Sequence, residues 1–217
     1  MNVTAPQLAD DLDIRTDLAR LIKHDETLMA ATIRDEDISG LQIKSFTAVE
    51  LRLEKVNASQ IKLEKTGFMD VELVSCELTA AALPDSSWRR VSMKGSRASG
   101  LQLQTSTLKD VTFTDCKLDL ANFRFCKLTN VFFKDCVLDE ADFYSAELQG
   151  VAFQNCILGK TEFSTAKLKQ TDFRSSNITT ILGVSSLAGA IIDSVQLVAL
   201  APMLANELKI TVKDELG

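Results

Sequence analysis

A five-residue repeat runs without a change of phase from about Leu28 to Ile178, and it constrains the fold more than any other feature of the chain. Between Val111 and Ser175 the third residue of every pentad is Phe or Leu, and the two alternate strictly. The first residue of each of these pentads is Val, Cys, Ala or Thr. Upstream of Leu108 the third residues become more varied, but the spacing of five is kept.

Neither an α-helix nor a straight strand can use this pattern. Five helical steps of about 100° each rotate a side chain by about 140° in total, which would scatter the Phe and Leu residues around the helix. In a straight strand an odd period would place successive Phe and Leu residues on opposite faces. A chain that turns a corner once per pentad can point the first and third residues inward and the other three outward.

Four such corners close a coil, so residues twenty apart should stack in columns. One inward column consists of Val or Leu, namely Leu51, Val71, Val91, Val111, Val131 and Val151. The next inward column consists of Cys or Ser, namely Cys76, Ser96, Cys116, Cys136, Cys156 and Ser176. Phe residues line two opposite sides of the coil and Leu residues line the other two. We therefore expect an all-β solenoid, a four-sided parallel β-helix of seven to eight coils.

The pentads ANFRF, ADFYS and TDFRS carry a resemblance to a known family. They match the consensus A(D/N)LXX of the pentapeptide-repeat family, and the chain resembles that family over about 70% of its length. The resemblance implies a right-handed quadrilateral β-helix. With a helical C-terminal segment, the chain is similar to the branch of the family whose function is uncharacterised.

Both ends of a parallel β-helix need a cover, because the core and unpaired backbone groups are open there. We expect residues 1–27 to form an N-terminal helical cap around Leu8, Leu12, Leu18, Leu21 and Ile22, residues 28–182 to form the β-helix, and residues 183–217 to form a C-terminal cap helix and tail. Ser194 is the expected N-cap of that helix, and Pro202 should kink it. One helix face carries Leu197, Leu200, Leu204 and Leu208, which either cap the last coil or form a dimer contact.

Composition places the chain among ordinary soluble domains, with 46% hydrophobic and 25% charged residues. The N-terminus has no basic segment followed by an apolar run, and no stretch approaches eighteen apolar residues, so neither secretion nor membrane contact is expected. All five cysteines fall at inward first positions of pentads, as free thiols that a reducing compartment permits. We therefore expect a cytoplasmic protein.

No pattern in the sequence predicts catalysis or a cofactor. The chain has no GxSxG, Gly-rich phosphate loop or HExxH motif. A cysteine nucleophile needs an exposed thiol and a neighbouring base, whereas these cysteines point inward. Outward carboxylates on a convex rod lack a cleft that would shift their pKa values. We expect neither enzymatic activity, nor a metal site, nor a cofactor.

Several outward positions carry large apolar residues where polar ones are usual, namely Leu120, Phe125, Phe132, Val137, Tyr144 and Ile157. Val137 and Ile157 are twenty apart and should stack in one column, and Phe125 and Tyr144 should lie one coil apart. Clustered exposed apolar side chains are typical of contact surfaces. The alternative is that they are ordinary surface residues covered by longer neighbours.

These observations favour a non-catalytic protein-interaction or structural module with an unidentified protein partner, which also leaves a homodimer open. The alternative comes from the family, some of whose members resemble DNA in shape and charge and bind type II topoisomerases such as DNA gyrase. The net charge of −6 is not concentrated on the repeat, because residues 26–182 hold 21 acidic and 19 basic side chains, a net of −2. Direct binding of nucleic acid is not expected.

Overall fold

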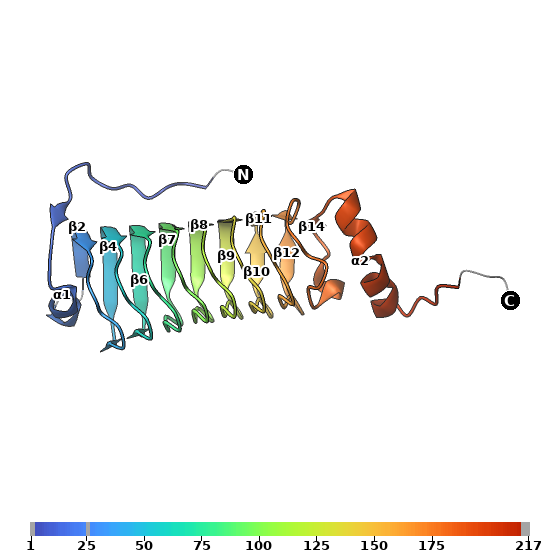
Figure 1. Cartoon of the computed structure of the whole chain (residues 1–217), viewed down its shortest axis with the longest axis horizontal. Coiled ribbons are helices and arrows are strands. Elements are labelled where there is room, and N and C mark those ends of the chain that lie inside the picture. Colours follow the sequence, from blue (N-terminus) through green and yellow to red (C-terminus); the bar gives the residue numbers. More distant parts are fainter. Residues whose placement is uncertain (1–2, 25–26, 214–217) are drawn as a thin grey trace.

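The chain forms a straight rod of stacked coils with a helix at each end (Figure 1). The computed structural model describes residues 3–24 and 27–213. Its elements are β1 (Asp13–Ile14), α1 (Leu18–His24), β2 (Thr27–Arg34), β3 (Gln42–Ile43), β4 (Phe46–Glu54), β5 (Lys62–Leu63), β6 (Thr66–Val74), β7 (Ser87–Lys94), β8 (Thr107–Thr114), β9 (Lys127–Lys134), β10 (Glu147–Gln149), β11 (Ala152–Gln154), β12 (Lys167–Lys169), β13 (Thr171–Asp172), the 3-10 turn η1 (Val184–Ser186), β14 (Ala190–Ile191) and α2 (Ser194–Glu207).

The strands are parallel, and from β2 to β13 they pair residues twenty apart. The predicted parallel β-solenoid is therefore confirmed. The main sheet follows the order β1-β2-β4-β6-β7-β8-β9-β11-β13-β14. The stack reaches about nine turns rather than seven to eight, because β14 adds a rung beyond the last regular pentad.

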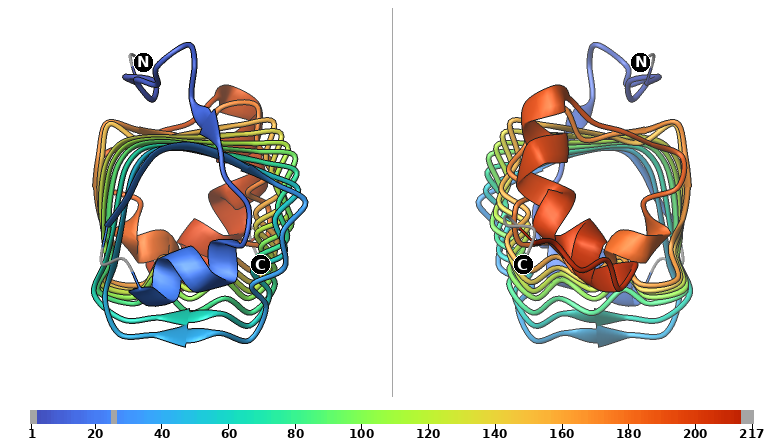
Figure 2. Two further views of the ribbon diagram at one scale, coloured as in Figure 1. Left: turned by 90° about the vertical axis from the view of Figure 1, so that its left-hand side faces the viewer. Right: turned by 90° about the vertical axis from the view of Figure 1, so that its right-hand side faces the viewer.

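The rod has four sides, as the view down its axis shows (Figure 2). We name each side by its residues in one coil: side D is 106–110, side A is 111–115, side B is 116–120 and side C is 121–125. Each side also includes the pentads that lie twenty residues, or a multiple of twenty, before and after these residues. Sides A and C are opposite, and so are sides B and D. Coils are counted from residues 26–45 (coil 1) to residues 166–185 (coil 8). Inward residues are buried, and the second, fourth and fifth residues of each pentad face outward.

The corners are made by a left-handed backbone conformation. From Ala30 to Ser175, the fifth residue of every pentad except Ser45 has φ between 48° and 69°. Most of these residues are not glycine, although the left-handed region disfavours any residue that has a Cβ. The stacking of one coil on the next therefore imposes this conformation against local preference.

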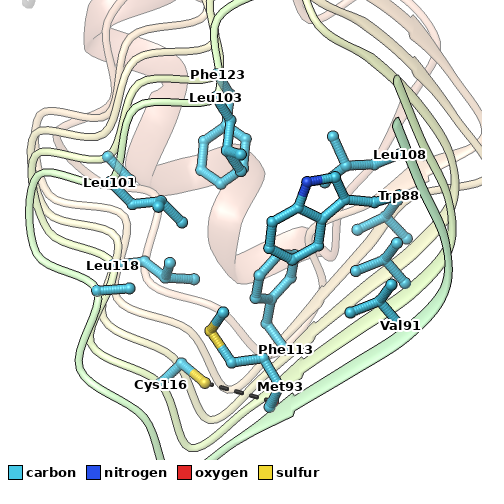
Figure 3. Packing of buried hydrophobic residues seen from close by; sticks show 14 of the residues in the cluster. Trp88, Val91, Met93, Leu101, Leu103, Leu108, Phe113, Cys116, Leu118 and Phe123 are labelled. Carbon is cyan, nitrogen blue, oxygen red and sulfur yellow. Dashed lines mark hydrogen bonds between the residues drawn. The ribbon is translucent and has the colours of Figure 1, made fainter. Parts of the chain in front are cut away.

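The core confirms the predicted columns of aromatic side chains. Phe113, Phe133, Phe153 and Phe173 stack on side A at centroid distances of 4.9–5.0 Å, and Phe123, Phe143 and Phe163 stack on side C at 4.7–5.2 Å. The two stacks meet edge to face, with Phe123 and Phe133 at 5.9 Å and 87°. Figure 3 shows Met93 in place of Phe at the N-terminal end of the side A stack and Trp88 beside it in the Leu column of side D.

The core is less completely filled nearer the N-terminus. Ala48 and Ala58 occupy inward positions there, and an apolar cavity of about 50 Å³ lies between them and the surrounding Leu and Ile side chains. Leu18 and Ile22 of α1 close this end of the core. The helix therefore covers the first coil, over part of the 1–27 segment for which the sequence suggested a helical cap.

The segment before α1 differs from the expected helical cap. Residues 3–12 are not helical and run back along the outside of the rod (Figure 1). The backbone N–H of Gln7 donates to Asp70 Oδ1 at 2.9 Å, and Asp70 also pairs with Arg90. Burial disfavours the charged carboxylate, but the hydrogen bonds from Arg90 and Gln7 hold the pKa of Asp70 below its ordinary value. Asp70 of the rod thus satisfies the N–H of Gln7, a backbone group that needs a partner once the segment is not helical.

At the other end the repeat gives way to α2. Gly183 adopts φ 75°, and η1 follows it, so that β13 and β14 pair residues nineteen apart instead of twenty. The N-cap of α2 is Asp193 rather than Ser194, because Asp193 and Gln196 form a reciprocal capping box. The helix continues through Pro202, which lies on its exposed side.

Replacing Gly183 with Ala should destabilise this junction. A Cβ at Gly183 would lie 2.3 Å from the backbone N of Ser164, and the residue is in the left-handed region. We expect a loss of more than about 2 kcal/mol in the free energy of unfolding, measured by urea denaturation. Gly40 is the matched control, since it has φ +67° but none of the described atoms lies within 4 Å of its Cβ position. Gly40→Ala should cost only about 1 kcal/mol. Equal losses would contradict this account.

Candidate protein-interaction site

The corner between sides C and D carries an exposed aromatic cluster. The rings of Phe125 and Tyr144 meet edge to face at a centroid distance of 5.8 Å. The guanidinium of Arg124 lies 4.4 Å from the centroid of Tyr144 and 5.6 Å from that of Phe125. Arg124 also donates to Asp142 Oδ2 at 2.9 Å, which fixes its orientation. The stacking period of twenty brings these side chains together, as the sequence predicted for Phe125 and Tyr144.

Leu120 and Phe125 occupy the two corners that bound side C. Both adopt φ 59°, and 56% and 50% of their surfaces are exposed. An exposed Leu or Phe in the left-handed region gains little from burial, and Asn, Asp or Gly would be less strained there. The folding of the rod therefore gives no reason for either residue.

Val137 and Ile157 form a separate pair on side B. They are bridged in register one coil apart, and Ile157 is 47% exposed. Phe132 lies on side A, in an open groove of about 640 Å³ that Val3 of the N-terminal segment and Ala152 also line. The six apolar residues singled out in the sequence thus fall on three sides of the rod, and only Leu120, Phe125 and Tyr144 border side C.

The four Leu residues of the C-terminal helix are divided between the rod and the solvent. Leu200 is fully buried and Leu204 is half-buried against the core, whereas Leu197 and Leu208 are exposed. The outer surface of α2 also exposes Val195 and Val198, at 76% and 74%. The helix accordingly caps the last coil with one face and leaves a second apolar face uncovered.

The five thiols lie in the core at 0–3% exposure. Burial raises the pKa of the Cys126 thiol to about 12 and also raises that of Cys76. Cys116, Cys136 and Cys156 stack in one column, where a hydrogen bond from Cys136 lowers the pKa of Cys156. Figure 3 shows Cys116 donating to the carbonyl of Met93 at 3.4 Å. These thiols have backbone partners and no access to a substrate.

Some of the charged side chains are paired along the rod. Five ion pairs join residues twenty apart, one coil to the next: Arg34–Glu54, Arg52–Glu72, Arg90–Asp70, Lys160–Glu140 and Lys167–Glu147. Each carboxylate in these pairs has its charge offset by a base on the adjacent coil. The arrangement reduces the negative potential that a phosphate-like surface would need.

Sequence reasoning missed Arg124, Val195 and Val198. Arg124 occupies an outward position, and its contact with Tyr144 follows only when the residues are arranged in columns of twenty. The two valines were assigned to no helix face, because the Leu spacing dominated the pattern of α2. Among the described residues no cluster of three or more His, Cys, Asp or Glu side chains could hold a metal ion, and the structure has no helix long and apolar enough to cross a membrane in that part of the chain.

A match to a family model agrees with this architecture: residues 106–181 match the model of the pentapeptide repeat region. Two solved structures are also similar to the chain. HetL of the cyanobacterium Nostoc sp. strain PCC 7120 is 15% identical over 77% of this chain and 90% of HetL, with a TM-score of 0.39. A trypsin-treated form of QnrB1, a plasmid-mediated fluoroquinolone resistance protein, is 20% identical to this chain. The match covers 88% of this chain and 93% of the QnrB1 chain, with a TM-score of 0.39. No curated protein sequence matches the chain.

Proposed function

We propose that this chain, a pentapeptide-repeat protein, is a non-catalytic module that binds another protein through the surface of side C. The observation that carries the proposal is the pair of exposed, strained corner residues Leu120 and Phe125. Their side chains oppose the local preference of the backbone and add little to the core, so binding is the role that accounts for them.

The cluster beside Phe125 has the composition of an interface hot spot. Tyr and Arg are enriched among residues that dominate binding energies, and rigid aromatic side chains lose little entropy when they are covered. Arg124 is held by Asp142 and stacked on Tyr144, so the surface is ordered before a partner arrives. Such preorganisation lowers the cost of association.

The uncovered face of α2 offers a second contact surface. Val195 and Val198 project from the capped end of the rod, and no charged side chain of the helix precedes Glu207. A helix that is apolar on all faces usually has a partner on each of them. We propose that a second copy of the chain covers this face, which would make a homodimer through the C-terminal ends.

Replacing Phe125 with Asn should separate binding from stability. The left-handed corner tolerates Asn better than Phe, so the free energy of unfolding should stay equal or rise by up to about 1 kcal/mol. Binding of a cellular partner, measured by quantitative affinity capture against the wild type, should fall by at least about tenfold. Thr105→Asn, at the same corner one coil earlier, is the matched control and should leave capture unchanged. A Phe125→Asn variant that is less stable than the wild type, or that retains every partner, would contradict the proposal.

Mimicry of DNA toward a type II topoisomerase is the less supported alternative. It would need a run of unpaired carboxylates, whereas the carboxylates of Glu54, Glu72 and Glu140 are paired with bases. We expect the purified protein neither to inhibit gyrase supercoiling nor to relieve its inhibition by a quinolone. Inhibition that disappears on replacing Asp115 and Asp135 with Asn would favour mimicry instead.

The proposed setting is the cytoplasm. Five buried, reduced thiols suit a reducing compartment, since oxidation of any of them would have to disrupt the core. The proposed role requires neither a metal nor an organic cofactor, and it involves no direct contact with nucleic acid or a lipid bilayer.

A further inference from the structure

The opposite sides B and D carry opposite charges. At its outward second and fourth positions, side D has one acid, Glu147, and five bases between Ser87 and Lys169: Arg89, Lys109, Lys127, Lys167 and Lys169. The same positions of side B hold two bases, Arg97 and Lys117, and four acids: Asp37, Glu77, Asp119 and Asp139. The bases of side D remain exposed in the presence of the N-terminal segment.

Each of these sides also carries a short apolar column. On side D, Met29, Val49 and Met69 are paired in register over coils 1 to 3, and Met29 and Met69 are 54% and 37% exposed. On side B, Val137 and Ile157 are paired over coils 6 and 7. The apolar columns therefore lie toward opposite ends of the rod.

We propose that copies of this chain pack side by side, with side B of one copy against side D of the next and with the two rods antiparallel. This proposal rests on the proposed function, because it names a second copy as the partner of one surface of an interaction module. Since both rods have the same spacing of about 4.8 Å between coils, a flush antiparallel contact places coil n of one copy opposite coil 9 − n of the other.

That register matches both the apolar and the charged residues. Val137 falls opposite Met69, and Ile157 falls opposite Val49. Three of the four acids fall opposite bases: Asp37 meets Lys167 and Lys169, Glu77 meets Lys127, and Asp119 meets Arg89. Asp139, the fourth, lies opposite the coil of Met69, which carries no base on side D. Lys160, at the corner of coil 7, meets Glu50. Three like-charged approaches remain: Arg97 to Lys109, Lys117 to Arg89 and, at the corners of coils 6 and 3, Glu140 to Asp70. A parallel flush contact would instead place Val137 opposite Lys127 and Ile157 opposite Glu147.

The contact is heterologous, because it joins two different surfaces. A copy that uses side B still has a free side D, so the contact repeats along a twofold screw axis perpendicular to the rods and does not close. The expected product is an open ribbon that grows with concentration. Charge pairs that face solvent weaken as ions screen them, so high salt should dissolve it.

Charge exchange tests the contact directly. The side-B variant Glu77→Lys/Asp119→Lys places bases opposite bases, and the side-D variant Arg89→Glu/Lys127→Glu places acids opposite acids. Each alone should raise the concentration for half-association by at least about tenfold. An equimolar mixture should recover assembly, because each variant then meets a complementary surface on the other. The quadruple variant should recover it alone. Sedimentation velocity at low ionic strength over a range of concentrations measures all five samples, and circular dichroism checks that each is folded.

Three outcomes would overturn the proposal. The wild type could remain a single species at every concentration, the mixture could fail to recover assembly, or growth could stop at a dimer. A dimer that tolerates both charge variants but is lost on Val198→Asp would leave the contact proposed above for α2 and remove the contact between sides B and D. The Phe125→Asn capture experiment does not depend on any of these, so failure of the ribbon leaves the role of side C to be judged separately.

Discussion

The Phe133→Ala variant should lose about 3–5 kcal/mol of its free energy of unfolding, which is the cost of deleting a fully buried aromatic ring. Phe133 lies in the middle of the side A stack, 4.9 Å from both Phe113 and Phe153. Its edges also meet Phe123 and Phe143 of side C at 5.9 and 6.2 Å. The β-helix holds its coils at a fixed spacing, so the walls cannot collapse into the space that the ring leaves.

Urea denaturation followed by two probes measures this loss. Far-ultraviolet circular dichroism reports the whole rod, and the fluorescence of Trp88, the single tryptophan, reports coil 4. Stacked coils contact only their neighbours, so the two transitions should separate if the stack opens first around Phe133. Phe132→Ala is the matched control. That ring is half-buried on the outside of the same strand, so its removal should cost less than about 1.5 kcal/mol. Comparable losses for the two variants would show that the aromatic stack is not the main source of stability.

The core could be predicted because it repeats. The inward positions are chosen by the same packing in every coil, so the alternation of Phe123, Leu128 and Phe133 in the sequence is also their order around the core. A period of five excludes an α-helix and a straight strand, and the spacing of twenty residues between coils fixes which side chains are in contact. Side-chain contacts within the stack therefore followed from spacing alone.

The ends and the outer surface could not be predicted in the same way. Residues 3–12 contain apolar residues at spacings that suit a helix, yet Asp70 binds the backbone of Gln7 and holds the segment extended. That contact joins residues 63 apart and leaves no periodic signal. The left-handed backbone conformation at the corners could not be predicted either, because residues as different as Leu120 and Lys160 adopt it.

At the junction with α2, the role of Gln196 could not be predicted from the spacing of apolar residues. Gln196 sits among apolar residues of the helix, and Ser194 was the plausible cap. In the structure Gln196 Oε1 accepts from the N–H of Asp193 at 3.0 Å, and Asp193 Oδ1 accepts from the N–H of Gln196 at 2.9 Å. The Nε2 atom donates to the carbonyls of Phe173 and Ser176 at 2.7 and 2.8 Å. The side chain thus joins the start of the helix to the open edge of the last coil.

Gln196→Leu should therefore cost at least about 2 kcal/mol, because two carbonyls beneath α2 lose their donor and the helix loses half of its capping box. Hydrogen exchange should locate the change, with faster exchange in α2 and β14 and unchanged protection around Phe133. Gln149→Leu, on an exposed strand of side D, is the control and should change stability by less than about 0.5 kcal/mol.

Gln196→Glu distinguishes lost donors from lost packing. Glu keeps the length of the side chain and can still accept from Asp193, but at neutral pH it places a carboxylate against the oxygens of Phe173 and Ser176. We expect it to be more destabilising than Gln196→Leu at neutral pH. Its stability relative to the wild type should recover as the pH falls, because a protonated Glu can donate to one of the two carbonyls. If Glu proved milder than Leu at neutral pH, the two hydrogen bonds from Nε2 would not be what holds α2 on the rod.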